Sequence, residues 1–206
     1  MMSEQMIEEQ IKARGVRDPL VLEAVRKVDR RRFVPDEFKD DAYEDCPLPI
    51  GWGQTISQPY IVALMTELMG LKGGEKVLEI GAGSGYQAAV LGEICTEVYT
   101  IEITKPLAER SAALLKELGY DNVRLKAGDG FEGWPEQAPF DAIIVAAAPK
   151  EIPQPLIEQL ADGGRMVIPV GSFRQELMVI EKKHGRVTKQ NIIPVRFVPM
   201  TGKIEE

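Results

Sequence analysis

The chain has 206 residues, of which 44% are hydrophobic and 28% charged, and its formal net charge is −7. These apolar side chains are enough for a packed core, which excludes a largely disordered chain, and the length corresponds to about one domain. The longest apolar runs, such as 142–149, are too short to cross a bilayer, and the acidic N-terminal residues lack the apolar core of a secretion signal. The negative charge argues against a nucleic-acid partner, because phosphate binding requires a positive face.

Few residues are available for metal or thiol chemistry. Cys46 and Cys95 form no paired motif, which favours small buried side chains in a reducing interior over a disulfide or a catalytic thiol. His184, the only histidine, stands in KKHGR between two strand-like runs, where a turn residue is expected. The sequence therefore offers too few histidine and cysteine residues for a zinc site or a Ser-His-Asp triad. We predict no metal and a cytoplasmic location.

The N-terminal third predicts helices followed by an irregular stretch. Residues 3–32 are expected to form two helices, the second beginning at Asp18-Pro19. The cluster Arg30, Arg31 and Arg32 suits either a basic binding face or, as the helix dipole favours, a solvated helix end. Residues 33–53 are rich in proline and aspartate and predict irregular structure, and 59–69 predict a helix.

From residue 76 onward, short apolar runs alternate with helical patterns. The predicted strands are 76–80, 98–102, 123–126, 141–146 and 165–170, and the predicted helices are 85–94, 106–118 and 153–160, the last ended by Asp162-Gly163-Gly164. This alternation indicates βαβ units and a mostly parallel sheet. Residues 177–182 and 187–198 flank His184-Gly185 and predict an antiparallel hairpin at the sheet edge.

These elements predict an α/β fold in one domain, residues 1–206. Residues 1–70 would supply N-terminal helices and a segment that covers the active site. Residues 71–206 would supply a mostly parallel, cofactor-binding core that ends in antiparallel edge strands.

The most informative segment is KVLEIGAGSG, which reads as a strand, a glycine loop and a helix start. Glycines let the backbone approach a ligand, and a helix N-terminus offers N–H groups, although a tight turn also requires small residues. The loop has Gly81, Gly83 and Gly85, whereas a dinucleotide fingerprint would place its third glycine where Tyr86 stands. Glu79, two residues before the loop, would repel a pyrophosphate and attract an ammonium or a sulfonium. The loop therefore favours S-adenosylmethionine over NAD.

Two further acids follow predicted strands. Glu102 comes about 20 residues after the loop, where a carboxylate can accept hydrogen bonds from ribose hydroxyls or simply face solvent. Asp129 stands between two glycines and can reach an adenine amino group or cap a turn, whereas Asp141, at a strand start, is expected to be structural. Because open α/β sheets bind ligands at the carboxyl ends of strands, the predicted cofactor-binding residues are Glu79, Gly81, Gly83, Gly85, Glu102, Asp129 and Gly130.

The stretch GWGQTISQP, residues 51–59, followed by YIVALM, closely resembles the signature of protein-L-isoaspartate O-methyltransferases. The resemblance continues through VLEIGAGSGYQAAVL, the strand that ends at Glu102, GDG at 128–130 and FDAIIVAAAPKEIPQPLIEQLADGGRMVIPVG. It ends with RFVPMTG and covers about residues 5–202. Many methyltransferases share the glycine loop, whereas the QTIS segment and the closing VRFVP are much more specific.

This resemblance implies a Rossmann-like, S-adenosylmethionine-dependent methyltransferase fold with its last strands rearranged. Family members transfer a methyl group from S-adenosylmethionine to the free carboxylate of L-isoaspartyl residues in damaged proteins, and S-adenosylhomocysteine is the product. Ser57 matches the family's active-site residue, Thr55 and Ile56 would line the methyl-transfer site, and Val198 would shape the substrate cleft. The implied partners are isoaspartyl proteins and peptides, and we expect a monomer with no nucleic-acid or membrane partner.

Other interpretations remain open at this point. Ser57 stands two residues before Pro59, so it suits a helix cap as well as a catalytic position, and Gly51 and Gly53 would give the covering segment its backbone freedom. The alternative functions are a methyltransferase acting on a small molecule or RNA, a nicotinamide-dependent oxidoreductase, and a non-catalytic adenosine-nucleotide sensor. The QTIS segment argues against the first, and Tyr86 with the lone histidine argues against the second.

Overall fold

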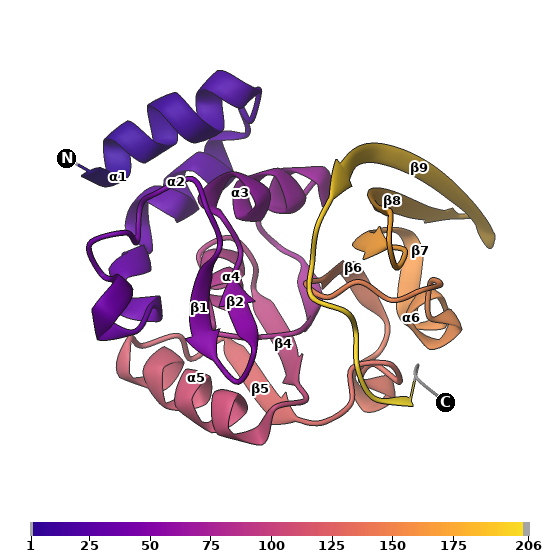
Figure 1. Ribbon diagram of the computed structural model, residues 1–206. Coiled ribbons are helices and arrows are strands. Elements are labelled where there is room, and N and C mark those ends of the chain that lie inside the picture. The colour runs from indigo at the N-terminus through magenta and orange to yellow at the C-terminus, as the bar shows by residue number, and fades with distance from the viewer. Residues whose placement is uncertain (1, 204–206) are drawn as a thin grey trace.

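A seven-stranded sheet with the order β5-β4-β3-β6-β7-β8-β9 forms the centre of the computed structural model, which describes residues 2–203 (Figure 1). Neighbouring strands from β5 to β7 are parallel, and β8 and β9 are added antiparallel at one edge. The strands are β3 (Lys76–Ile80), β4 (Glu97–Glu102), β5 (Val123–Ala127), β6 (Phe140–Val145), β7 (Leu160–Val170), β8 (Gln175–Lys183) and β9 (Arg186–Val195). The predicted mostly parallel sheet with antiparallel C-terminal strands is confirmed.

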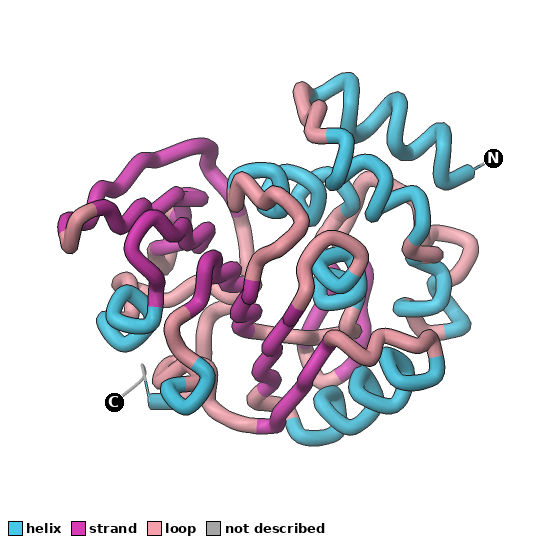
Figure 2. Tube along the Cα trace, turned by 180° about the vertical axis from the view of Figure 1, so that it is seen from behind, coloured by secondary structure: helices cyan, strands magenta, loops and turns pink. Residues whose placement is uncertain are grey.

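Helices cover both faces of this sheet (Figure 2). Along β3, Val77 and Leu78 are both fully buried but belong to two different apolar clusters, because successive strand residues point to opposite faces. The larger cluster lies under α3 (Pro59–Leu68), α4 (Tyr86–Gly92) and α5 (Lys105–Glu117), and the smaller one under α6 (Gln154–Gln159). The larger cluster also takes in the N-terminal helices.

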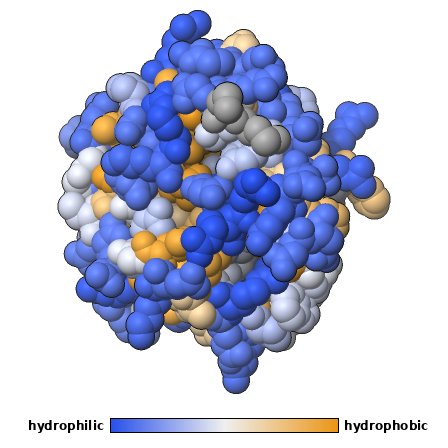
Figure 3. Space-filling view, turned by 90° about the vertical axis from the view of Figure 1, so that its left-hand side faces the viewer, coloured by the Kyte–Doolittle hydropathy of each residue, from blue (hydrophilic) through white to orange (hydrophobic). Residues whose placement is uncertain are grey.

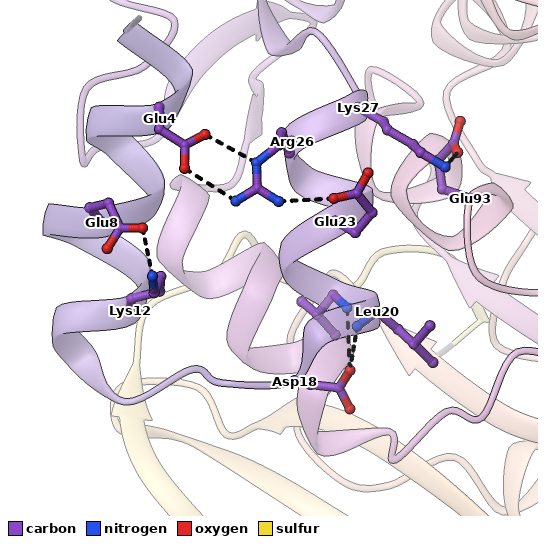
Figure 4. Close-up of polar contacts among 10 residues, drawn as sticks. Glu4, Glu8, Lys12, Asp18, Leu20, Glu23, Arg26, Lys27 and Glu93 are labelled. Atoms are coloured by element: carbon purple, nitrogen blue, oxygen red, sulfur yellow. Dashed lines mark hydrogen bonds and ion pairs between the residues drawn. The ribbon is translucent and has the colours of Figure 1, made fainter.

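The N-terminus forms one continuous helical rod followed by a second helix (Figure 4). The rod comprises α1 (Met2–Gln5), a π-helical stretch (Met6–Ile11) and a 3₁₀ turn (Lys12–Arg14), and the second helix is α2 (Pro19–Lys27). Asp18 caps α2 by accepting a hydrogen bond from the Leu20 N–H at 2.8 Å. The Arg26 guanidinium bridges Glu4 on the rod and Glu23 on α2, at 3.0 and 2.9 Å.

The arginine cluster after α2 divides between solvent and core. The helix ends at Lys27 rather than near residue 32, and Arg30 begins a separate 3₁₀ turn. Arg31 and Arg32 are exposed, as expected of a solvated helix end, but for Arg30 that interpretation is wrong, because its side chain is fully buried. Its Nε donates to the Ala42 carbonyl at 2.7 Å, and its guanidinium lies 5.0 Å from the centre of the Tyr86 ring. Arg30 thus joins the N-terminal segment to the start of α4.

The sequence predicts irregular structure over residues 33–53, but part of this stretch forms a regular strand. Its last residues form β1 (Leu48–Gly51), which pairs with β2 (Gln54–Ile56) in a two-stranded hairpin. The turn consists of Trp52 and Gly53, with φ of 52° and 71°. Two central residues with positive φ are typical of the tight turn that matches the twist of a hairpin. Strands of four and three residues are too short for their alternation to stand out in the sequence.

Two further boundaries differ from the prediction. β7 begins at Leu160, which pairs with Phe140, so the residues Asp162-Gly163-Gly164 lie within an irregular part of the strand rather than in a turn before it. β9 ends at Val195 instead of 198. The segment beyond it leaves the sheet edge, and its Pro199 pairs with Ala148, three residues after the end of β6. The chain therefore returns across the carboxyl ends of the parallel strands.

The side of the molecule that carries the N-terminal helices is mostly hydrophilic, with apolar residues visible in small areas between polar ones (Figure 3). Within residues 2–203, none of the helices has the length and apolar character required to span a membrane.

We expect apolar burial, rather than surface ion pairs, to hold the N-terminal rod in place. Ile7 is fully buried, so Ile7→Ala should lower the free energy of unfolding by about 2–5 kcal/mol. Arg26→Gln should lower it only slightly, because its ion pairs lie in solvent. Urea unfolding of both variants tests this, and a larger loss for Arg26→Gln would contradict it.

Candidate active site

A pocket that we call the inner pocket lies at the carboxyl ends of β3, β4 and β6. The strand order reverses between β3 and β6, and open α/β sheets bind ligands at such a point. The pocket holds about 930 Å³ of empty space when its open mouth is included. Its walls come from the glycine loop, the β1–β2 hairpin and the segment after β9.

The glycine loop directs its N–H groups into the protein. Those of Gly81 and Ala82 donate to the Ile101 carbonyl at 2.8 and 3.1 Å, and that of Gly85 donates to Ala82 at 2.8 Å. The Gly83 N–H donates to a carboxylate. The N–H groups at these positions are therefore used within the protein. Such a loop suits a ligand that packs against its backbone better than a pyrophosphate, which requires N–H donors.

Glu102 gives the inner pocket its charge. Its Oε2 accepts a hydrogen bond from the Gly83 N–H and its Oε1 from the Thr104 N–H, each at 2.8 Å, so the carboxylate is held at the pocket wall. Each oxygen keeps a lone pair for a further donor, such as a ribose hydroxyl. Of the described residues that line the inner pocket, Glu102 is the only Asp or Glu, and none is Lys, Arg or His. The pocket therefore favours a ligand with positive charge.

Glu79, also predicted to bind the cofactor, lies behind the pocket wall rather than in it. The side chain is fully buried, Thr100 donates a short hydrogen bond to its Oε2, and its Oε1 has no partner among the described residues. Burial raises the pKa of Glu79 to about 8; the Thr100 hydrogen bond opposes the rise, and the charge of Glu102 adds to it. At neutral pH this carboxyl is mostly protonated, so the structure shows only one of the two acids as a charged pocket residue.

The other predicted cofactor residues have different surroundings. Gly130 lines the inner pocket, and an added Cβ would lie 2.3 Å from Ile80 Cγ2, so only glycine fits. The neighbouring Asp129 is not among the lining residues, and its carboxylate accepts hydrogen bonds from the N–H groups of Phe131 and Lys203 at 2.9 and 2.7 Å. Gly85 also lies outside the lining and provides space for Leu115 instead.

The β1–β2 hairpin brings Thr55, Ile56 and Ser57 to the inner pocket. Thr55 and Ser57 also line a second depression, which we call the outer cleft, so the two spaces adjoin at these residues. Ser57 does not cap α3, because Gln58 occupies the N-cap position and makes no side-chain cap bond. This removes the cap interpretation and leaves Ser57 at the junction of the two spaces.

The segment after β9 closes the inner pocket from the other side. The Val198 carbonyl accepts a hydrogen bond from the Ala148 N–H at 2.8 Å, and the Met200 N–H donates to the Ala148 carbonyl at 2.9 Å. Gln175 holds the backbone of Phe197 through both its side-chain amide atoms, at 2.6 and 3.1 Å. Val198 thereby lines both the inner pocket and the outer cleft.

The hairpin is fixed against the core in a comparable way. Arg110 on α5 donates to the Ile50 carbonyl at 2.9 Å, and its guanidinium lies 5.5 Å from the centre of the Trp52 ring. A Cβ at Gly83 would lie 3.4 Å from Ile50, so the hairpin packs directly on the glycine loop. Hairpin and C-terminal segment together form a cover over the inner pocket.

Sequence reasoning missed several residues that build this site. Ala146 and Ala147 line the inner pocket immediately after β6, and the run of small residues after an apolar strand was the available signal. Gln175 gave no signal, because its role depends on a partner 22 residues away. Arg14 and Arg196 line the outer cleft.

The sheet order and a pocket of this kind at the switch point define a Rossmann-like methyltransferase fold. Residues 1–205 match the family model described as protein-L-isoaspartate(D-aspartate) O-methyltransferase. The chain belongs to this family.

Similar proteins of known sequence or structure have the same family description. A protein-L-isoaspartate O-methyltransferase from Opitutus terrae is 56% identical over 200 residues, which are 96% of this chain and 86% of the relative. A solved protein-L-isoaspartate O-methyltransferase superposes with a TM-score of 0.90 at 31% identity, over 99% of this chain and 67% of the other. A Plasmodium falciparum protein of the same description, in complex with S-adenosyl-L-homocysteine, has a TM-score of 0.84 at 29% identity, over 97% and 98% of the two chains.

We expect Glu79 to make stability fall with rising pH. The pKa of Glu79 rises from an ordinary value of 4.5 to about 8 in the folded chain. Its contribution to stability is therefore complete below about pH 4.5 and is lost as the pH rises toward about 8. Glu79→Gln has no such titration, so its free energy of unfolding relative to the parent chain should increase between about pH 6 and about pH 9, on the order of 2 kcal/mol.

Chemical denaturation at both pH values measures this difference. The exposed Glu136→Gln is the matched control and should give the same difference from the parent at both values. A pH-independent effect of Glu79→Gln would show that Glu79 is ionised in the folded chain.

Proposed function

We propose that this chain transfers a methyl group from S-adenosylmethionine to the free carboxylate of L-isoaspartyl residues in damaged proteins and peptides, leaving S-adenosylhomocysteine. One observation carries the proposal in a chain of this family: among the described lining residues, a pocket with one acid and no cation adjoins a cleft with two arginines and no acid, and Ser57 lies where they meet. This arrangement suits a cationic donor beside an anionic acceptor. The cytoplasmic location and monomeric state predicted from the sequence are part of the same proposal.

The residues of the inner pocket fit the proposed cofactor. S-adenosylmethionine supplies a methyl group on a positively charged sulfur. Glu102 would accept hydrogen bonds from its ribose hydroxyls, and Gly81, Gly83 and Gly130, which line the pocket, would contact the ligand through their backbone. The absence of cations among the described lining residues agrees with the sulfonium and the ammonium and argues against a nicotinamide dinucleotide, whose pyrophosphate would face Glu102.

The acceptor requires no general base. A carboxyl group with a reference pKa of roughly 4 is ionised at neutral pH, so its oxygen can form the new bond to carbon while the carbon–sulfur bond breaks and its electrons stay on sulfur. In agreement, His184 is an exposed residue in the β8–β9 turn. The role of the residues around the site is therefore to position the reactants and exclude water. Good alignment alone lowers the activation free energy by up to about 7–11 kcal/mol.

Ser57 is placed to hold the acceptor. Its hydroxyl can donate a hydrogen bond to the carboxylate without removing a proton, while Thr55 and Val198 confine the acceptor on either side. The hairpin and the C-terminal segment limit the access of water from both flanks. Ser57 thus acts as a catalytic residue by contact with the acceptor, and Thr55, Ile56 and Val198 as substrate-binding residues.

A labelled-methyl assay tests the proposed function. We expect label to pass from S-adenosylmethionine to a peptide with one L-isoaspartyl residue, and not to the same peptide with a normal aspartyl residue. The ester should be lost under mild base, as expected of a carboxyl methyl ester. Cofactor binding without transfer to the isoaspartyl peptide would favour a sensor or another acceptor, and labelled RNA or amines would indicate a different methyltransferase.

Ser57→Ala should lower kcat by about 10- to 100-fold, because a hydrogen bond to a charged group contributes about 1.5–3 kcal/mol. Cofactor affinity, measured by calorimetry, should stay nearly unchanged, since the hydroxyl serves the acceptor. The free energy of unfolding should also stay nearly unchanged, because Ser57 caps no helix. Thr188→Ala, an exposed hydroxyl on β9, is the control. Unchanged turnover with a destabilised α3 would make Ser57 structural.

A further inference from the structure

The outer cleft differs in charge from the rest of the molecule. It is bordered by the hairpin, the start of α3 and residues 193–198. The chain has a net charge of −7, yet the described residues that line this cleft include Arg14 and Arg196 and no Asp or Glu. In an acidic protein, a positive cleft attracts anionic groups against the general field of the surface.

Arg14 is already engaged by the protein. Its Nη1 lies 2.7 Å from Asp45 Oδ2, and its guanidinium carbon lies over the Tyr60 ring, 3.5 Å from the ring centre. Gln58 donates to the other oxygen of Asp45 at 3.1 Å, which fixes the group further. Arg14 therefore has its charge neutralised close by and serves as a wall of the cleft.

Arg196 has no such neighbour. The residue is exposed, and within residues 2–203 it forms no salt bridge. Its backbone is nevertheless well placed, because the next two residues are held by Gln175 and Ala148. A free cation on an anchored segment, two residues before Val198, lies beside the path by which a peptide reaches Ser57.

We propose that Arg196 is a specificity-determining residue that recognises a second carboxylate on the peptide, on a residue next to the isoaspartyl group. This proposal rests on the proposed function. The reacting carboxylate belongs at the junction with the inner pocket, where Ser57 lies, whereas Arg196 lines only the outer cleft. Acidic flanking residues should therefore promote methylation, and basic ones should oppose it.

Peptides that differ only beside the isoaspartyl residue test this. Glu, Gln or Lys is placed at either flanking position, with both peptide ends blocked so that no terminal charge interferes. We expect kcat/KM at the better position to be about two- to fivefold higher for Glu than for Gln, with Lys lower by a similar factor. The difference should lie in KM, and it should shrink as salt is raised, because screening weakens an exposed pair.

Arg196→Gln should abolish the order Glu, Gln, Lys while retaining methylation of the Gln peptide, and Arg196→Lys should restore part of it. Lys189→Gln removes the same charge from an exposed position on β9 outside the cleft and should leave the order intact. The proposal is overturned if Arg196→Gln keeps the order, or if it slows all three peptides equally, which would place Arg196 on the reacting carboxylate. Failure of the parent chain to methylate any isoaspartyl peptide would instead reject the proposed function.

Discussion

The site depends on two adjoining spaces of opposite charge, with Ser57 between them. Glu102 is the one carboxylate in the described lining of the inner pocket, and the described lining of the outer cleft includes two arginines and no Asp or Glu. The donor is a cation and the acceptor an anion, so the two groups attract each other where the two spaces meet. The chemistry then needs alignment rather than proton transfer, which explains how a chain with a single histidine in a surface turn can serve this reaction.

This junction forms because two segments that are far apart in the sequence lie over the same end of the sheet. The hairpin comes from the N-terminal part and rests on the glycine loop, held by Arg110, while the segment after β9 is held by Ala148 and Gln175. The buried Arg30 contacts both Ala42, which precedes the hairpin, and Tyr86 at the start of α4. The apolar face of the N-terminal rod belongs to the same core cluster as α4. The helices before the hairpin therefore support the cover as well as the core.

The sequence predicts the parallel core well, because strands such as β3 and β6 are apolar runs separated by long helical patterns. It predicts less where structure depends on a distant partner. β1 has four residues and no clear alternation, and β9 ends early because Ala148 captures the following segment. Arg30 looks like its two exposed neighbours until Tyr86 and Ala42 enclose it. Among the site residues, Asp129 and Gly85 were expected to bind the cofactor, yet local packing uses both.

A sequence motif can suggest the same role for two residues whose surroundings differ, as Glu79 and Glu102 show. Both acids come near the ends of neighbouring strands, and in the sequence they look equivalent. In the sheet, Glu79 pairs with Thr100 and is enclosed, whereas Glu102 is held at the pocket surface by two backbone N–H groups. Burial raises the pKa of Glu79 to about 8 although Thr100 donates a hydrogen bond to it, and the charge of Glu102 adds to the rise. Glu79, mostly protonated at neutral pH, therefore lies behind the wall as a neutral group, whereas Glu102 lines the pocket where a cationic donor would bind.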